Sequence, residues 1–199
     1  MHTYTPQEFI LPSLKGISHR QVEVHLGLYQ GYVKTINTLR EEIADLTKID
    51  PDKHAFAIES VRRRLGFEFN GMRLHEIYFT QWEGGASAEP RESELGKILS
   101  EKYTDWDGFI AHFRKVGMSR GPGWTTLGWD ARAKQPHIWW TADHELGMLA
   151  DTRILLSMDM WEHAYLVDYL PAEKSKHIDA FFQNLNWNIV EKRFADATV

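Results

Sequence analysis

Asp159 and His163 stand four positions apart in the segment DMWEHAY, and both side chains could bind a metal ion. Two further histidines, His25 and His75, fall inside long segments with helical periodicity. Two antiparallel helices could place them opposite each other, next to DMWEHAY, as a shell of three imidazoles and one carboxylate. The chain holds ten histidines, so many such sets of four can be drawn. Spacing alone therefore leaves two interpretations open: a metal site, or hydrogen-bonded core histidines beside an aspartate that forms a turn.

Composition limits both the class of protein and the kind of metal site. The 199 residues include no cysteine, which excludes disulfides, thiolate ligands and cysteine nucleophiles. Any metal must therefore be held by His, Asp, Glu or water. Hydrophobic residues make up 43% of the chain and charged residues 26%, and no apolar run approaches the roughly 20 residues of a membrane helix. We expect a globular protein that does not enter a membrane.

Charge and the N-terminal sequence indicate where the protein acts and on what. The formal net charge is −5, and the basic residues are spread along the chain, so no nucleic-acid binding is predicted. The N-terminal sequence shows no basic segment followed by an apolar one, so a cytoplasmic location is expected.

Two long helices must position the histidines of the first half. Apolar residues recur at steps of three and four over residues 18–46, which predicts a helix with Ser18 as its N-cap. The sequence KIDPDK interrupts this pattern, and a second helix is predicted over residues 54–82. Together they should form an antiparallel hairpin, the N-terminal domain of residues 1–83.

The second half differs in composition and periodicity, and the change begins after EGGASAEP. Helices are predicted over residues 92–101 and 105–116, and again from residue 173 onward. The segments WTTLGWD and QPHIWWT, joined by ARAK, indicate a β-hairpin, with RILLSMD as a third strand. The predicted fold class is α+β: a two-helix antiparallel hairpin, then an α/β lobe with a three-stranded antiparallel sheet, the C-terminal domain of residues 90–199. The metal site would lie at the junction of the two domains.

The segment DMWEHAY resembles the D-x-W-E-H-A-Y signature of the iron/manganese superoxide dismutases. In the same order as in that family, FILPSLKGIS resembles F-x-L-P-x-L, YQGYV its Tyr-Val, GPGW its G-S-G-W, and NWNIVEKRF its N-W-x-x-V-x-x-R-Y. The resemblance covers nearly the whole chain. It implies an enzyme that converts superoxide to O2 and hydrogen peroxide and that forms a homodimer or homotetramer.

The same resemblance implies a ligand set for one Fe or Mn ion per subunit. The family's ligands fall on His25, His75, Asp159 and His163, with water or hydroxide as a fifth. Imidazole, carboxylate and oxygen ligands suit Fe and Mn, whereas zinc cannot cycle electrons. Two alternatives stay open: a non-haem iron oxygenase-type enzyme, and a catalytically weak superoxide dismutase homologue that acts as a metal-binding structural protein.

One departure from the family concerns the gateway tyrosine of the substrate funnel. In the family a histidine follows the first ligand at plus four and the gateway tyrosine at plus eight, whereas this chain has Tyr29 at plus four and Tyr32 at plus seven. On a regular helix plus seven returns to within about 20° of His25, and plus eight lies about 80° away. We therefore hypothesise a straight α-helix, without a π-bulge, that keeps Tyr32 at the funnel. The alternative is that Tyr29 fills the gateway.

A second departure concerns the contact between subunits. The family's signature usually continues with a second tyrosine, which bonds the plus-four histidine of the neighbouring subunit. Leu166 and Tyr29 occupy these two positions here, so both halves of the contact have changed together. Glu162, whose counterpart bridges to the partner's ligand histidine, is retained. A dimer through this surface is expected, and a solvated glutamate is the alternative.

A third departure concerns the glutamine that hydrogen-bonds the metal-bound solvent in the family. Its two usual positions are taken by Gly71, four residues before His75, and by His144 in TADHE. Gly71 leaves room without offering a donor. His144 could donate to the solvent and titrate near neutral pH, which would make the redox potential pH-dependent. The alternative is a histidine in a surface loop.

Aromatic residues are expected to form an apolar wall around the ion. Trp124, Trp161 and Tyr78 match the family's wall positions, while Phe79 stands where a tryptophan is usual. Such a wall limits solvent access. Because the substrate is an anion, a local basic funnel would help, and the candidates are Lys34 and Arg193.

Overall fold

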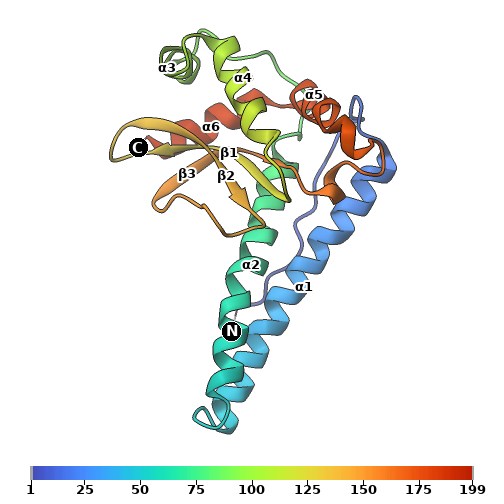
Figure 1. The fold of residues 1–199 in the computed structure, drawn as a ribbon, viewed down its shortest axis with the longest axis vertical. Coiled ribbons are helices and arrows are strands. Elements are labelled where there is room, and N and C mark those ends of the chain that lie inside the picture. Colours follow the sequence, from blue (N-terminus) through green and yellow to red (C-terminus); the bar gives the residue numbers. More distant parts are fainter. Residues whose placement is uncertain (1, 199) are drawn as a thin grey trace.

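A computed structural model describes residues 2–198 of the chain (Figure 1). The elements in chain order are α1 (His19–Ile49), α2 (Ala55–Thr80), α3 (Glu94–Lys102), α4 (Trp106–Gly117), β1 (Gly123–Asp130), β2 (Gln135–Ala142), β3 (Thr152–Asp159), two 3-10 turns (Glu162–Ala164 and Pro171–Glu173), α5 (Lys174–Asn184) and α6 (Trp187–Ala197). In Figure 1, α1 and α2 form a long hairpin whose free end extends away from the other elements. The predicted α+β fold class is confirmed.

Helix α1 begins where the sequence predicted and runs slightly further. The Ser18 hydroxyl accepts a hydrogen bond from the backbone N–H of Gln21 at 3.0 Å, which satisfies one of the free donors of the first turn. The helix continues to Ile49, three residues beyond the predicted end. Its buried residues recur at steps of three and four and therefore share one face: Gln21, His25, Tyr29, Val33 and Ile36.

The sheet has the strand order β2-β1-β3, with both pairs antiparallel. The central strand β1 is buried over all but its last residue, so it reads as a continuous apolar and Thr-rich run without polar alternation. In the turn to β2, the Asp130 carboxylate accepts hydrogen bonds from the N–H groups of Arg132 and Ala133. Strand β3 lies at one edge of the sheet, and its last residue, Asp159, pairs with Trp124.

The C-terminal end of α2 packs directly against the sheet, so one core runs through both halves of the chain. The Gln81 side chain donates to the Ser157 carbonyl at 2.6 Å. The Arg193 guanidinium donates to the carbonyls of Ile77 and Leu155 at 3.0 and 3.1 Å. Arg193 therefore joins α6 to α2 and β3, which corrects its expected place in a basic funnel. The division into domains at residues 83–90 stays a prediction.

Within residues 2–198, no helix has an apolar stretch long enough to cross a membrane.

Candidate metal centre

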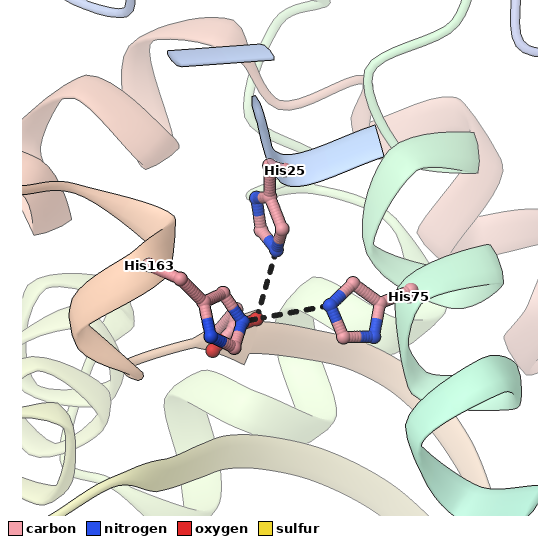
Figure 2. A group of neighbouring side chains, drawn as sticks. His25, His75 and His163 are labelled. Carbon is pink, nitrogen blue, oxygen red and sulfur yellow. Dashed lines mark hydrogen bonds and ion pairs between the residues drawn. The ribbon is translucent and has the colours of Figure 1, made fainter. Parts of the chain in front are cut away.

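Four side chains that lie far apart in the sequence converge at one point. Each offers one nitrogen or oxygen atom, and these atoms all lie within 4.8 Å of one another: His25, His75, Asp159 and His163. The Nε2 atoms of His25 and His163 lie 3.0 and 3.2 Å from Oδ2 of Asp159. The Nε2 atom of His75 lies 3.6 Å from the same oxygen. Figure 2 shows the three imidazoles turned toward this carboxylate.

Each of the four residues comes from a different element. His25 lies on the buried face of α1, and His75 lies near the C-terminal end of α2. Asp159 is the last residue of β3, and His163 lies in the 3-10 turn that follows. Three of them are buried, and the side chain of His163 is 18% exposed. The cluster therefore joins the helical hairpin to the sheet.

The tautomer of His75 leaves its Nε2 atom unprotonated inside this cluster. Its Nδ1 lies 2.6 Å from the Gly71 carbonyl, which can only accept, so Nδ1 carries the proton. The Nε2 atom of the neutral ring is then an unprotonated acceptor, and it is buried with no hydrogen-bond partner among residues 2–198. It faces the Asp159 carboxylate, which is also an acceptor. A cation between the two would satisfy both.

The protonation states of the cluster also suit metal binding. Burial lowers the pKa of His25 below its usual value and that of His75 further below it. Burial by itself raises the pKa of Asp159, but the imidazoles of His163 and His25 hold this pKa well below its usual range. Neutral imidazoles and an ionised carboxylate are the forms in which these groups bind metals.

A chain of hydrogen bonds through Trp124, His144 and Tyr32 lies beside the cluster. The Trp124 indole can only donate, so the Nδ1 of His144, 2.9 Å away, must accept. The neutral His144 ring then carries its proton on Nε2 and donates it to the Tyr32 hydroxyl at 2.7 Å. Because that hydroxyl oxygen accepts from His144, the Tyr32 proton is free for another acceptor. The Tyr32 and His75 ring centroids lie 5.1 Å apart.

This chain of hydrogen bonds corrects the expectation for His144. The side chain is fully buried, so it is not a histidine of a surface loop. Burial lowers the pKa of His144 to about 4, so the prediction that it titrates near neutral pH is wrong. Both ring nitrogens are already engaged, by Trp124 and Tyr32, and the imidazole acts on the site through Tyr32.

The depressed pKa of His144 predicts how stability changes with pH. The unfolded chain binds a proton at this residue near pH 6.5, and the folded chain binds one only near pH 4. Its contribution is therefore complete above pH 6.5 and declines as pH falls toward 4. Between pH 7.5 and pH 5 the metal-free protein should lose about 2 kcal/mol of unfolding free energy through His144. Urea unfolding should show this extra loss in the wild type relative to His144→Gln, and equal losses would contradict it.

The two tyrosines of α1 have separate roles. Helix α1 is α-helical from His19 to Ile49, as the straight-helix hypothesis requires, and Tyr32 lies beside the cluster. The Tyr29 hydroxyl instead accepts from the backbone N–H of Gln7 at 2.8 Å and donates to Glu76 at 3.1 Å. Tyr29 therefore packs its ring near His75 but directs its hydroxyl to the N-terminal segment, which favours Tyr32 over the alternative that Tyr29 fills the gateway.

Gly71 makes room for the Tyr32 ring. A Cβ atom at position 71 would lie 2.6 Å from Cδ1 of Tyr32. Gly71→Ala should therefore displace the ring and break its hydrogen bond to His144. The catalytic rate should fall by roughly tenfold, the lower end of the 10- to 100-fold loss typical when residues around metal ligands are substituted. The gain of about 1 kcal/mol from alanine in a helix should be cancelled by overpacking.

The matched control for this substitution is Gly27→Ala in α1. A Cβ there meets nothing within 4 Å, so thermal stability should rise while activity stays unchanged. Thermal melts and activity assays of both variants test the prediction. An active and stabilised Gly71→Ala variant would contradict it.

Aromatic rings surround the cluster as expected. Trp124, Tyr78 and Phe79 are fully buried, and the Trp161 ring stacks on that of His163 with centroids 5.5 Å apart. Trp161 also stacks on His144 at 4.9 Å. These contacts support the predicted apolar wall, in which Phe79 takes the usual place of a tryptophan.

Two residues of α2 near the cluster were missed from the sequence. The Phe67 ring lies 4.5 Å from that of His144, and the Arg64 guanidinium lies 3.8 Å above the Phe67 ring. Arg64 also forms an ion pair with Glu68 at 2.7 Å. Their positions four and seven residues before Gly71 were the available signal, because this spacing puts them near the helix face of His75. Arg64 thus contacts a ring that packs on His144, whereas the predicted cation Lys34 is exposed on α1.

The α+β fold and the buried cluster of three imidazoles and one carboxylate define a mononuclear metalloprotein with nitrogen and oxygen ligands. A family model described as iron/manganese superoxide dismutases, C-terminal domain, matches residues 91–193. The chain therefore belongs to the iron/manganese superoxide dismutase family.

Curated relatives agree with this assignment over almost the full length. The chain is 32% identical over 202 residues to superoxide dismutase (Fe) of Aquifex pyrophilus, covering 99% of this chain and 93% of that protein. It is 30% identical to superoxide dismutase (Fe) of Tetrahymena pyriformis, covering 85% and 87%. It is 29% identical to superoxide dismutase (Mn/Fe) of Propionibacterium freudenreichii subsp. shermanii, covering 92% and 90%.

Proposed function

We propose that this protein is a superoxide dismutase in which His25, His75, Asp159 and His163 hold one iron or manganese ion per subunit. The observation that supports this most directly is the bare Nε2 of His75, which faces Oδ2 of Asp159 at 3.6 Å in a buried site. Two acceptors at this distance do not stabilise each other, whereas a shared cation would bind both. A bound Fe or Mn ion supplies the one-electron oxidation of one superoxide and the one-electron reduction of a second.

The chain's own residues would control protons and access at the site. Burial raises the pKa of Tyr32 well above its usual value, so its phenol keeps the proton at neutral pH. Because His144 donates to the Tyr32 oxygen, the O–H of Tyr32 can donate to a substrate that is gaining negative charge. The rings of Trp124 and Trp161 lie against that of His144, the hydrogen-bond partner of Tyr32, and limit the space on this side of the site, which favours a small substrate over larger reductants.

Metal reconstitution tests the proposed function. Protein loaded with iron alone and with manganese alone should each be assayed for metal content and for superoxide consumption. We expect at least one form to consume superoxide far faster than buffer. If both forms bind metal and neither exceeds buffer, the enzymatic proposal fails. An optical change on adding an organic co-substrate together with O2 would instead favour the oxygenase-type alternative.

We also propose a homodimer formed through the turn that carries His163. Glu162 is exposed there, and the nearby Leu166 and Val167 are 44% and 46% exposed, so apolar surface surrounds a carboxylate. Glu162 would accept a hydrogen bond from the ligand histidine of the partner subunit. Analytical ultracentrifugation should show a dimer, or a tetramer made of two dimers, for the wild type and dissociation for Leu166→Glu. A wild-type monomer would contradict the proposal.

A cytoplasmic location is the remaining proposal, and it comes from the sequence alone. Cell fractionation with an antibody to this protein tests it, with the soluble cytoplasmic fraction as the expected result. Recovery from an extracytoplasmic fraction would overturn it.

A further inference from the structure

The main-chain carbonyl of Asp159 has an unusual partner. Asp159 pairs with Trp124 at the edge of the sheet, and the ladder bond there runs from the N–H of Met160 to the Gly123 carbonyl at 2.9 Å. The Asp159 carbonyl therefore points away from β1, toward the open edge of β3. A buried carbonyl in that position needs a donor from outside the sheet.

His177 of α5 supplies that donor. Its Nε2 lies 3.0 Å from the Asp159 carbonyl oxygen, and the side chain is fully buried. A carbonyl can only accept, so Nε2 carries the proton and the Nδ1 of the neutral ring is bare. That Nδ1 has no hydrogen-bond partner among the described residues. Within residues 2–198, this imidazole thus makes one polar contact, with the main-chain carbonyl of Asp159.

Gln21 makes an equivalent contact with the other ligand of the same segment. It lies four residues before His25 on the buried face of α1 and is 2% exposed. Its Nε2 donates to the His163 carbonyl at 2.6 Å, and its Oε1 accepts from the N–H of Val167 at 3.0 Å. One amide therefore spans the two ends of the turn that carries His163.

This turn has little regular secondary structure of its own. It consists of a 3-10 helix of only three residues, Glu162–Ala164, and such helices have poor hydrogen-bond geometry. The position of the His163 imidazole relative to Asp159 therefore depends on contacts from other elements. Gln21 and His177 provide such contacts from α1 and α5.

We infer that Gln21 and His177 are positioning residues, which hold the carbonyls of His163 and Asp159 and thereby set the geometry of these two metal ligands. The inference rests on the proposed function only in that the four-residue cluster holds a metal. Residues that orient ligands change metal affinity and the electronic structure of the ion even when they do not touch it.

The test compares Gln21→Met and His177→Phe, which keep approximate volume and remove the donors. Each protein is loaded with iron or manganese, and two quantities are measured: the rate of metal loss to excess chelator and the electron paramagnetic resonance spectrum. Each variant should lose metal roughly 10- to 100-fold faster than the wild type and show a changed spectrum.

Two further variants separate positioning from a general structural role. His177→Gln places an amide donor near the position of the imidazole Nε2 and should restore a metal-loss rate and spectrum close to wild type. Gln30→Met makes the matched change on the exposed side of α1 and should leave both quantities unchanged. If Gln21→Met does not fold, Gln21→Glu takes its place, because it keeps the acceptor for Val167 and loses only the donor to His163.

The inference would be overturned if both donor-deleting variants lost metal at a rate within twofold of wild type and gave the wild-type spectrum, even with lowered melting temperatures. A wild type that binds metal without consuming superoxide would refute the proposed function and leave this test intact. A wild type that binds neither ion would overturn both.

Discussion

Asp159→Asn should remove the bound metal and superoxide consumption while the chain still folds. Oδ2 of Asp159 is the atom on which all three imidazoles converge, so the substitution removes the one negative charge of the cluster. Substitution of a residue that hydrogen-bonds a metal ligand lowers metal affinity or activity by about 10- to 100-fold. Loss of the ligand itself should lower both by more than a hundredfold. The asparagine amide has the same shape and can donate to the unprotonated Nε2 of His75, so the chain should still fold, but loss of the ionised carboxylate beside His25 and His163 should make the metal-free protein less stable than the metal-free wild type.

Asp143→Asn is the matched control for this substitution. Asp143 lies next to the site, where its carbonyl accepts from the Trp161 indole, but its carboxylate is outside the four-residue cluster. Its backbone has a φ of 53°, which asparagine tolerates well. Metal analysis, circular dichroism and superoxide assays should separate the two variants. A metal-replete, active Asp159→Asn protein would refute the ligand assignment.

Removal of the metal should cause the second large effect, a loss of thermal stability. The four residues come from α1, α2, β3 and the turn after it, so a bound ion links the hairpin to the sheet. A ligand present at a thousand times its Kd stabilises the native state by about 4 kcal/mol. For a chain of this length, that corresponds to a decrease in melting temperature of roughly 10 °C on chelation.

Differential scanning calorimetry of metal-loaded and chelated protein measures this decrease. The Asp159→Asn variant is the control, because a protein that does not bind the ion should show the same melting temperature in both conditions. An equal melting temperature for the loaded and chelated wild type would mean that the ion does not connect these elements.

Much of the fold was accessible from periodicity. Steps of three and four predicted the first long helix, the interruption at KIDPDK placed the second after it, and Ser18 forms the predicted N-cap. The run WTTLGWD was correctly assigned to a strand although it does not alternate, because its β-branched and aromatic residues are bounded by a turn. Local propensity and hydrophobic spacing act over a few residues, so they can be read before the chain is folded.

The sequence could not predict what the polar residues near the site would contact. Arg193 was expected near the substrate, but it donates to main-chain carbonyls between α6, α2 and β3. His144 was expected to titrate near neutral pH, but burial lowers its pKa to about 4. Desolvation and hydrogen-bond partners depend on residues more than a hundred positions apart, as for His144 and Tyr32.

The sequence by itself determined the helical hairpin, the three strands, the family and the four residues that could bind a metal. Only the tertiary structure decided that these four meet at one carboxylate oxygen, that Tyr32 rather than Tyr29 directs its hydroxyl to the site, and that Gln21 and His177 hold the ligands' carbonyls. The physical reason is that residue type and spacing specify local conformation and a set of donors. The direction of each lone pair and the burial of each charge arise only when distant segments pack together.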